Sequence, residues 1–457
     1  MLGSTITAIA TPPGSGGIGI IRISGPQALS VLQQIFRPGR PNCRFTPRHL
    51  YLGHATTPDG EEIDQVMAVY MPAPHSYTGE DVAEIQCHGG YVVCQEVLAA
   101  ALAAGASPAE PGEFTSRAFI NGKMSLDQAE AVIDIIEAKS SEALKISARQ
   151  LSGSLSRDIT NTADALLDLL AQLEVAVDYP EETDEAALAD STHTAISNAL
   201  DNVRRLLAQA RSGRYYREGV LTAIIGPPNA GKSTLLNALL ERERSIVTPI
   251  AGTTRDTVEE YYLLNGLPLR LVDTAGIRDT DDPVERFGVE RSRQALADAD
   301  LILLLLDGSR PLDAFWRDLL LAHRHRPLLV ILNKSDLPVD AATTAELAAL
   351  CPDAPLLTLS ARTGGGMEEL RRAVWDKLLL NASGESLSGL INDRQKAALL
   401  AAEDALIAAD QHFELFFDAG LLSIDVQTAW QALAEISGRA AAEDVIDRVF
   451  QRFCLGK

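Results

Sequence analysis

The spacing of hydrophobic residues changes along the chain and predicts a different structure in each part. Residues 18–23 and 65–70 are rich in apolar and β-branched residues and lie between turn signals, which is typical of short strands. Residues 96–104 have a helical pattern that stops near Gly105. Residues 1 to about 120 are therefore predicted to form a compact α/β domain.

A helical pattern begins near Lys123. Ser125-x-x-Gln128 is a capping-box sequence, which marks the start of a helix. The apolar residues that follow recur at helical spacing: Ala129, Val132, Ile133, Ile136 and Leu144. Long helices are expected to about Arg211. Residues 178–190 interrupt them with six carboxylates and no basic residue, and we interpret this run as a solvated loop.

Apolar strands alternate with helices between residues 220 and 380. The clearest strands are 220–225, 269–272, 301–306 and 328–332. This alternation predicts a doubly wound α/β domain with a buried parallel sheet. Because the chain is helical again from residue 383 to 453, we expect this block to be inserted into a helical domain. The predicted domains span residues 1–121, 122–216, 217–380 and 381–457.

Composition narrows the function. The chain has 457 residues, 40 Lys+Arg and 62 Asp+Glu, so its formal net charge is −22. This balance excludes a free-standing basic nucleic-acid binder, although a local patch or a basic partner could still hold a nucleic acid. A basic stretch at residues 204–217, with Tyr215 and Tyr216, either contacts RNA or is a solvated helix end.

Cysteine usage and hydropathy predict the compartment. The five cysteines are scattered and form no CxxC pair, which argues against a disulfide framework or a thiolate zinc site. The purest aliphatic run, residues 301–306, is far shorter than the ~20 residues of a membrane helix. The N-terminus lacks the pattern of a signal peptide. We therefore expect a cytoplasmic protein without a membrane association.

Residues 226–233, with the sequence GPPNAGKS, fit the phosphate-binding pattern GxxxxGK[ST] and follow a predicted strand. Glycines allow backbone N–H groups to face phosphates. In this chemistry Lys232 neutralises the β- and γ-phosphates and Ser233 ligates Mg²⁺.

Further motifs follow in order. Residues 252–256 (GTTRD) offer a threonine to Mg²⁺ and the γ-phosphate, and residues 273–276 (DTAG) offer an acid near Mg²⁺ and a glycine N–H. In residues 333–336 (NKSD), the Asp336 carboxylate can accept both guanine N1–H and N2–H. Residues 360–362 (SAR) place a backbone amide where guanine O6 would lie. Together these motifs predict a GTP-binding domain.

This order of motifs resembles the Era-like GTPases of the translation-factor class, which serve ribosome assembly or tRNA modification. Ras-like members carry a water-positioning glutamine directly after DTAG, where this chain has Ile277. A hydrophobic residue cannot orient water, so the catalytic group must lie elsewhere. Asn229 indicates a monovalent-cation site, in which its oxygen and carbonyls of residues 248–253 hold K⁺ against the phosphates.

Other motifs extend the resemblance over the whole chain. They are residues 10–14 (ATPPG), 17–25 (GIGIIRISG), 77–81 (YTGED), 88–90 (HGG), 111–115 (PGEFT) and 454–457 (CLGK). They resemble the TrmE (MnmE) family of tRNA-modification GTPases, within the TrmE-Era-EngA-like group. Two positions depart from the family pattern, because Leu455 replaces the usual Ile and Ser15 stands where Arg is often found.

The resemblance implies a fold and a set of sites. The fold is an N-terminal α/β folate-binding domain, a helical domain and an inserted P-loop G domain. The folate-site positions are Arg22, Glu80, Lys123 and Lys457. The K⁺ ligands are Asn229, Thr248, Ile250 and Thr253, and the Mg²⁺ ligands are Ser233 and Thr254. Glu285 matches the glutamate that positions the attacking water. Cys454 is either a nucleophile or a buried filler of the core.

The residues then expected to contact GTP are Asn229, Ala230, Gly231, Lys232, Ser233, Thr234, Thr248, Pro249, Ile250, Ala251, Gly252, Thr253, Thr254, Asp273, Thr274, Ala275, Gly276, Asn333, Lys334, Ser335, Asp336, Ser360, Ala361 and Arg362.

The resemblance also implies an activity. A homodimer that hydrolyses GTP in a K⁺-dependent way would join the flavoprotein MnmG (GidA) in a heterotetramer or larger complex. Together they would add a carboxymethylaminomethyl-type group to C5 of the wobble uridine of certain tRNAs, with a tetrahydrofolate derivative carrying the one-carbon unit. The alternative is a GTP switch for ribosome assembly. It should carry a basic RNA-binding module after residue 383, where the sequence is instead helical and acidic.

Overall fold

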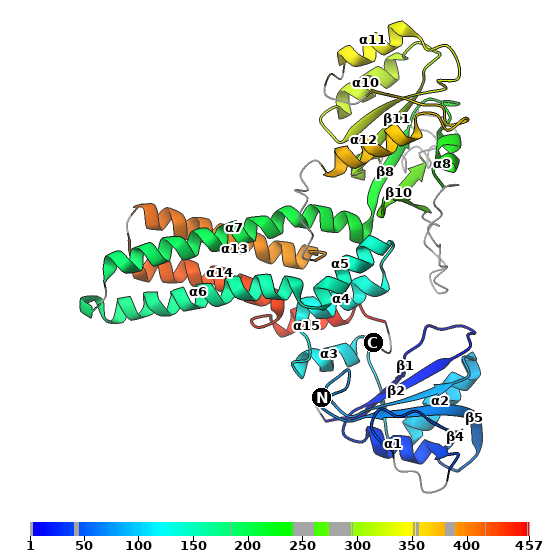
Figure 1. Ribbon diagram of the computed structural model, residues 1–457, viewed down its shortest axis with the longest axis vertical. Coiled ribbons are helices and arrows are strands. Elements are labelled where there is room, and N and C mark those ends of the chain that lie inside the picture. The colour runs from blue at the N-terminus through cyan, green and yellow to red at the C-terminus, as the bar shows by residue number, and fades with distance from the viewer. Residues whose placement is uncertain are drawn as a thin grey trace. The chain divides into compact units, whose positions relative to one another are not determined.

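The computed structural model describes residues 3–40, 45–182, 184–240, 260–273, 294, 296–350, 352, 356–379, 389–415, 417–454 and 456. The chain forms two compact units, shown as ribbons in Figure 1. The first comprises Met1–Ile133, Gln150–Asn202 and Ala397–Lys457, and the second comprises Asp134–Arg149 and Val203–Lys396. The domain limits at residues 121, 216 and 380 stay predictions.

The first unit begins with a seven-stranded sheet of order β3-β4-β5-β6-β2-β1-β7. Its strands are β1 Ile6–Ile9, β2 Gly19–Ser24, β3 Phe36–Pro38, β4 Tyr51–Thr56, β5 Glu62–Met71, β6 Val82–Cys87 and β7 Ser107–Pro108. Neighbouring strands are antiparallel except β1 and β7. The helices are α1 Ala28–Ile35, α2 Tyr91–Ala103 and α3 Glu113–Ile120. Both predicted strands are confirmed, and α2 begins before the predicted residue 96.

Helices make up the rest of the first unit and lead into the second. They are α4 Leu126–Ile136, α5 Ser141–Leu151, α6 Ser154–Asp178, α7 Glu185–Glu218, α13 Asp393–Leu415, α14 Ala419–Ser437 and α15 Glu443–Phe450, with a 3₁₀ turn, η1, at Pro180–Glu182. α6 packs along α14. Half of the predicted capping box is present, because Gln128 Oε1 accepts the backbone N–H of Ser125 at 2.9 Å.

The prediction of a loop over residues 178–190 is wrong in its second half, because α7 begins at Glu185. The cause is local. The Asp184 carboxylate accepts the backbone N–H of Ala187 at 3.2 Å, as a helix N-cap does. Glu185 lies in the first turn, where a negative charge is favourable. Carboxylates at the start of a helix therefore account for part of the acidic run.

The second unit contains the predicted α/β block. Its six-stranded sheet has the order β13-β12-β11-β8-β10-β9, parallel except for β9. The strands are β8 Val220–Ile225, β9 Glu260–Leu264, β10 Leu267–Asp273, β11 Leu301–Asp307, β12 Leu328–Asn333 and β13 Leu356–Thr358. The helices are α8 Lys232–Leu240, α10 Ala314–His323, α11 Ala341–Leu350 and α12 Met367–Leu379.

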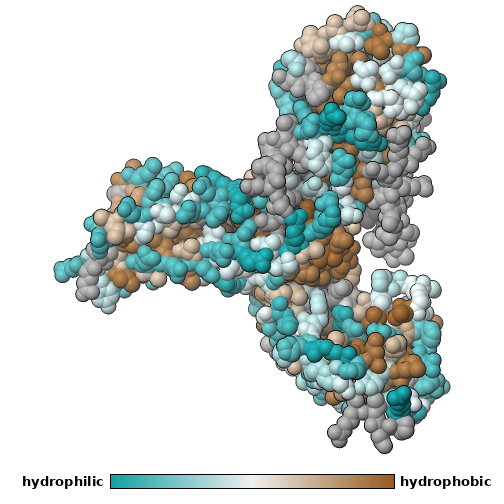
Figure 2. Space-filling model, in the orientation of Figure 1, coloured by the Kyte–Doolittle hydropathy of each residue, from teal (hydrophilic) through white to brown (hydrophobic). Residues whose placement is uncertain are grey.

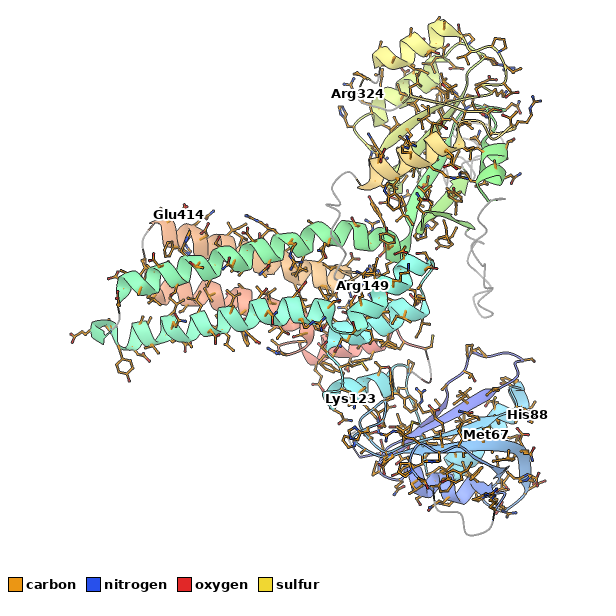
Figure 3. The ribbon with its side chains drawn as sticks, viewed as in Figure 1. Met67, His88, Lys123, Arg149, Arg324 and Glu414 are labelled. Carbon is orange, nitrogen blue, oxygen red and sulfur yellow. The ribbon has the colours of Figure 1, made fainter. Side chains whose placement is uncertain are left out.

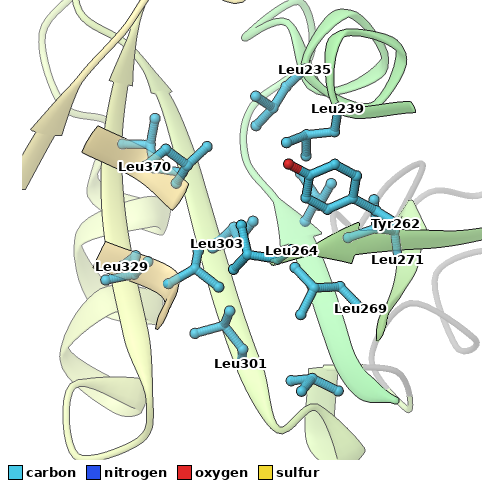
Figure 4. Packing of buried hydrophobic residues seen from close by; sticks show 14 of the residues in the cluster. Leu235, Leu239, Tyr262, Leu264, Leu269, Leu271, Leu301, Leu303, Leu329 and Leu370 are labelled. Atoms are coloured by element: carbon cyan, nitrogen blue, oxygen red, sulfur yellow. The ribbon is translucent and has the colours of Figure 1, made fainter. Parts of the chain in front are cut away.

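Alternate residues of β11 enter separate cores on the two faces of this sheet. Leu301, Leu303 and Leu305 pack with residues of α8 and α12, such as Leu235 and Leu370 (Figure 4). The residues between them and at the end of the strand, Ile302, Leu304 and Leu306, pack in a second cluster with residues of α10 and α11. A strand buried on both faces requires an unbroken apolar run, which is what residues 301–306 provide. The predicted doubly wound fold is confirmed.

Two further contacts connect parts of the second unit that lie far apart in the sequence. Lys139, before α5, donates to the Tyr261 hydroxyl of β9 at 2.6 Å and lies 4.3 Å from the centre of its ring. Gly213 of α7 lies against the backbone that precedes α13, because a Cβ at Gly213 would be 3.3 Å from the Ile391 nitrogen. The chain therefore enters and leaves the α/β block at neighbouring positions.

Candidate functional site

The phosphate-binding sequence forms the turn between β8 and α8. Gly226 has φ +155°, and a Cβ there would collide with the Leu305 carbonyl oxygen. Gly231 has φ +98°, and a Cβ there would collide with the Asn333 side chain. Both positions therefore require glycine for packing as well as for backbone conformation. Asn229, between them, also adopts a left-handed conformation, with φ +60°.

Lys232 begins α8, and its ammonium group reaches back over the turn. It donates to the carbonyl oxygens of Gly226 at 2.9 Å and Pro227 at 3.1 Å. These bonds hold a positive charge at the N-terminus of a helix, where the backbone dipole also favours an anion. The exposed Ser233 follows in the first turn of α8. This geometry is suited to the phosphates of a nucleotide.

Asn333, at the end of β12, connects three separate loops. Its amide nitrogen donates to the Ala230 carbonyl at 2.7 Å, and its amide oxygen accepts the Ala361 N–H at 2.9 Å. The side chain is buried. The phosphate-binding turn, the NKSD loop and the SAR loop are thus fixed relative to one another by one residue. In addition, the Ser335 N–H donates to the Leu359 carbonyl at 3.1 Å.

Asp307, which sequence reasoning missed, supports the same loop. Its carboxylate lies 2.7 Å from the Lys334 ammonium group. Burial raises the pKa of Asp307, but hydrogen bonds from Lys334 and Ser309 outweigh it and leave the pKa below its ordinary value. The signal available in the sequence was its position directly after the apolar run 301–306, at the carboxyl end of a parallel strand, where such sheets present their functional residues.

Asp336, in the NKSD loop, contacts two residues of the SAR loop. One carboxylate oxygen accepts the Ser360 hydroxyl at 2.7 Å, and the other lies 2.7 Å from the Arg362 guanidinium. The Ser360 hydrogen bond and the Arg362 charge hold the pKa of Asp336 below its ordinary value. Asp336 is therefore an ionised acceptor for N–H donors, as guanine recognition requires.

Several predicted residues lie outside the described part of the chain. They are Thr248, Pro249, Ile250, Ala251, Gly252, Thr253, Thr254, Thr274, Ala275, Gly276, Glu285 and Lys457. For Asp273 the structure describes the backbone, which ends β10 and pairs with Ile224 of β8. Thr234 lies in the first turn of α8. Of the predicted K⁺ and Mg²⁺ ligands, the structure therefore describes Asn229 and Ser233.

A second cluster of predicted residues lies in the N-terminal region, at the loop between β5 and β6. Arg22 of β2 forms an ion pair with Glu84 of β6 at 2.8 Å. The centre of its guanidinium lies 5.4 Å from the ring of Tyr77 and 5.7 Å from that of Phe114. The Arg22 guanidinium therefore lies over two aromatic rings and beside a carboxylate, so charged and aromatic groups meet at this position.

Glu80 is fixed in this cluster from two sides. Its carboxylate accepts the Ser24 hydroxyl at 2.8 Å and lies 3.1 Å from Arg117, which is 4% exposed. Lys123, labelled in Figure 3, donates to the Pro74 carbonyl at 3.0 Å, and its stem lies against Gly79. The structure therefore brings Arg22, Glu80 and Lys123 to one loop.

The C-terminal segment reaches the same region. The Arg22 guanidinium donates to the Gly456 carbonyl at 3.5 Å. Gly456 has φ +88° and lies so close to Ile9 that a Cβ there would collide with the Ile9 carbonyl. The first and last motifs of the sequence thus meet. Cys454 is exposed, so its interpretation as a buried filler is wrong.

Comparison with known proteins identifies the family. A family model described as "MnmE helical domain" matches residues 126–454, and one described as "GTP-binding protein TrmE N-terminus" matches residues 5–123. The chain belongs to the MnmE family. The family resemblance noted in the sequence is therefore confirmed.

Individual relatives match from end to end. A protein of Heliobacterium modesticaldum named tRNA modification GTPase MnmE is 45% identical over 100% of both chains. A protein of the same name from Chloroflexus aurantiacus is 46% identical over 100% of both chains. Another, from Lactiplantibacillus plantarum, is 45% identical over 99% of this chain and 98% of its own. Among the described residues of this MnmE-family chain, no helix combines the length and the apolar character needed to cross a membrane.

Proposed function

We propose that this MnmE-family chain binds and hydrolyses GTP and that this activity serves tRNA modification. The observation that carries the proposal is Asn333, which fixes the phosphate-binding turn and the two base-recognition loops in one arrangement. Asp336 accepts the N1–H and N2–H of guanine, and Lys232 contacts the phosphates. The names of the curated relatives, tRNA modification GTPase, support the same function.

Hydrolysis needs a group that replaces the missing glutamine at Ile277. Asn229 is exposed in a left-handed turn and so presents its side chain at the phosphate-binding turn. With Thr248, Ile250 and Thr253 it would hold K⁺, and with Mg²⁺ on Ser233 and Thr254 this would supply positive charge to the transition state. Glu285 orients the attacking water.

The N-terminal cluster is proposed to bind a reduced folate. Arg22, Glu80, Lys123 and Lys457 offer cations for the glutamyl carboxylates and a carboxylate for the pterin N–H donors. The half-buried aromatic ring of Tyr77, which faces Arg22, fits a flat ligand. With the flavoprotein MnmG (GidA), a homodimer of this chain would modify C5 of the wobble uridine in the cytoplasm, by adding a carboxymethylaminomethyl-type group.

The test measures GTP turnover in KCl and in NaCl, for the wild type and for Asn229→Ala, with nucleotide affinity measured alongside. We expect faster turnover in KCl, and loss of this response in Asn229→Ala without a comparable loss of affinity. Equal rates in both salts would contradict the cation mechanism. Mass spectrometry of wobble uridines in a deletion strain tests the modification, and unchanged uridines would contradict it.

A further inference from the structure

The negative charge of the chain is concentrated in one set of helices. Residues 158–202 and 397–438 contain 18 Asp+Glu and no Lys or Arg. Since the formal charge of the whole chain is −22, the remaining residues carry only −4. The two segments form most of α6, α13 and α14 and the first half of α7, all within the first unit. We call these segments the acidic bundle.

One end of the acidic bundle exposes large apolar side chains. Five residues are between 51% and 74% exposed: Val175, Val177, Tyr179, Leu415 and Ile424. They lie where α6 and α13 end and α14 begins. This is the end of the bundle at which α6 is followed by α7 and α13 by α14 (Figure 1). We call these five residues the bundle end. In Figure 2 hydrophobic and hydrophilic side chains alternate over these helices.

Two contacts show that the helix ends that carry these five residues are neighbours in space. Val177 of α6 lies 3.9 Å from the position of a Cβ on Gly420, which is one turn before Ile424 in α14. His412, one turn before Leu415, lies 2.6 Å from the Asp425 carboxylate. The last turns of α6 and α13 therefore both contact the first turns of α14, and their apolar side chains share one end.

Exposed carboxylates lie on or beside the helix turns that carry the apolar residues. They are Glu174, Asp178, Glu181, Glu414 and Asp418. Glu414 is labelled in Figure 3. An apolar centre with a charged rim is the usual composition of a protein–protein interface. The sign of the rim is uniform, which restricts the partner.

Charge separates the candidate occupants. A second copy would bring its own 18 carboxylates against the first, and like charges disfavour such contacts. Nucleic acid is repelled for the same reason. Small cations would neutralise the rim but leave the apolar side chains in water. A protein surface with Lys and Arg around apolar residues satisfies both features.

We propose that the bundle end is a docking site for a basic protein surface with apolar anchors, and that this surface belongs to the partner that holds the tRNA. The identity of that partner rests on the proposed function. The remainder of the chain is then close to neutral and does not repel the tRNA that the partner brings. Opposite charges at such a site mainly accelerate association, and the buried apolar side chains mainly slow dissociation.

The experiment measures binding of the purified full-length chain to its flavoprotein partner by surface plasmon resonance at several salt concentrations. Leu415→Ser/Ile424→Ser is expected to weaken binding at least tenfold, mainly by faster dissociation. Asp178→Asn/Glu181→Gln/Glu414→Gln is expected to slow association and to reduce its dependence on salt. Control variants make the same chemical changes in the α/β block, at the exposed Leu321 (Leu321→Ser) and Glu369 (Glu369→Gln).

Circular dichroism and GTP turnover identify variants that fail to fold, because none of these residues lies at the nucleotide site. Wild-type affinity in both docking variants would overturn the inference and leave the proposed function intact. Self-association that the same variants abolish, or cross-linking of tRNA to the bundle end, would identify another occupant and also overturn it. Failure of the wild type to bind the flavoprotein would overturn the proposed partnership and this inference with it.

Discussion

Arg362 forms an ion pair with Asp336, the residue expected to recognise guanine. Its guanidinium lies 2.7 Å from Asp336 Oδ2. A guanidinium presents N–H donors side by side, as the N1–H and N2–H edge of guanine does. Arg362 is 77% exposed and belongs to a loop, so it is free to move away at little cost. We therefore expect guanine and Arg362 to compete for the same acceptor.

Arg362→Ala should accelerate GTP association several-fold, because the carboxylate no longer has to exchange partners. The measurement is stopped-flow fluorescence with a labelled guanine nucleotide. Arg372→Ala, an exposed arginine in α12, is the control and should leave the rate unchanged. An unchanged association rate with faster dissociation would show instead that Arg362 packs on the bound base.

Asp336→Asn should weaken GTP binding by roughly 100-fold, because two hydrogen bonds to a charged acceptor are lost or weakened. The amide introduces an N–H donor that matches the second carbonyl of xanthine. We therefore expect the variant to prefer xanthosine triphosphate, in competition titrations against GTP. Retained preference for GTP would contradict the role of Asp336.

Asp127→Asn should change how stability depends on pH. Burial raises the pKa of Asp127, although the Ser125 and Ser156 hydroxyls hydrogen-bond its carboxylate, and the negative charge of Glu130 adds to the rise. A raised pKa means that the folded state binds the proton more tightly, so the contribution of Asp127 to the stability of the wild type falls as pH increases above the ordinary value of 3.8. The asparagine variant lacks this loss.

The difference in unfolding free energy between Asp127→Asn and wild type should therefore grow as pH increases from 4 towards neutrality, and then level off. Urea titrations at several pH values measure it. Asp404→Asn, on an exposed position of α13, should give a difference that does not grow in this way. A difference for Asp127→Asn that falls with pH would contradict the sign of the shift.

Alkylation should distinguish the cysteines. Cys454 is exposed, whereas Cys87 and Cys94 are buried with their sulfurs 3.8 Å apart. Burial, followed by the Cys94 thiol, raises the pKa of Cys87 to about 12. At pH 8 iodoacetamide should modify Cys454 within minutes and leave Cys87 unmodified until the protein unfolds, as measured by peptide mass spectrometry. Equal labelling of the two folded-state thiols would refute the difference.

Local sequence predicted what depends on local geometry. The phosphate-binding turn follows from Gly226 and Gly231, because each adopts a positive φ that favours glycine. The apolar run from Leu301 to Leu306 predicted a strand buried on both faces, and the two cores confirm it. Each of these features is encoded within a few residues.

Residues whose partners lie far along the chain were not predictable in this way. Arg117 binds Ser4 and Glu80, and Glu84 binds Arg22, across separations that no periodicity encodes. Asp307 and Lys334 meet because β11 and β12 are adjacent in the sheet. The start of α7 was missed for a different reason. Carboxylates such as those of residues 184 and 185 suit both the start of a helix and a solvated loop, so the sequence does not distinguish the two.

Gly213 lies against the backbone at Ile391, so we expect that the α/β block can be removed from the chain as a unit. Its two ends are side by side, so a linker of a few residues would suffice to join α7 to α13 once residues 219–388 are deleted. Insertions with neighbouring ends disturb their host little, since the host chain is not pulled apart. The same geometry would let an engineer exchange the block for another domain whose two ends are equally close.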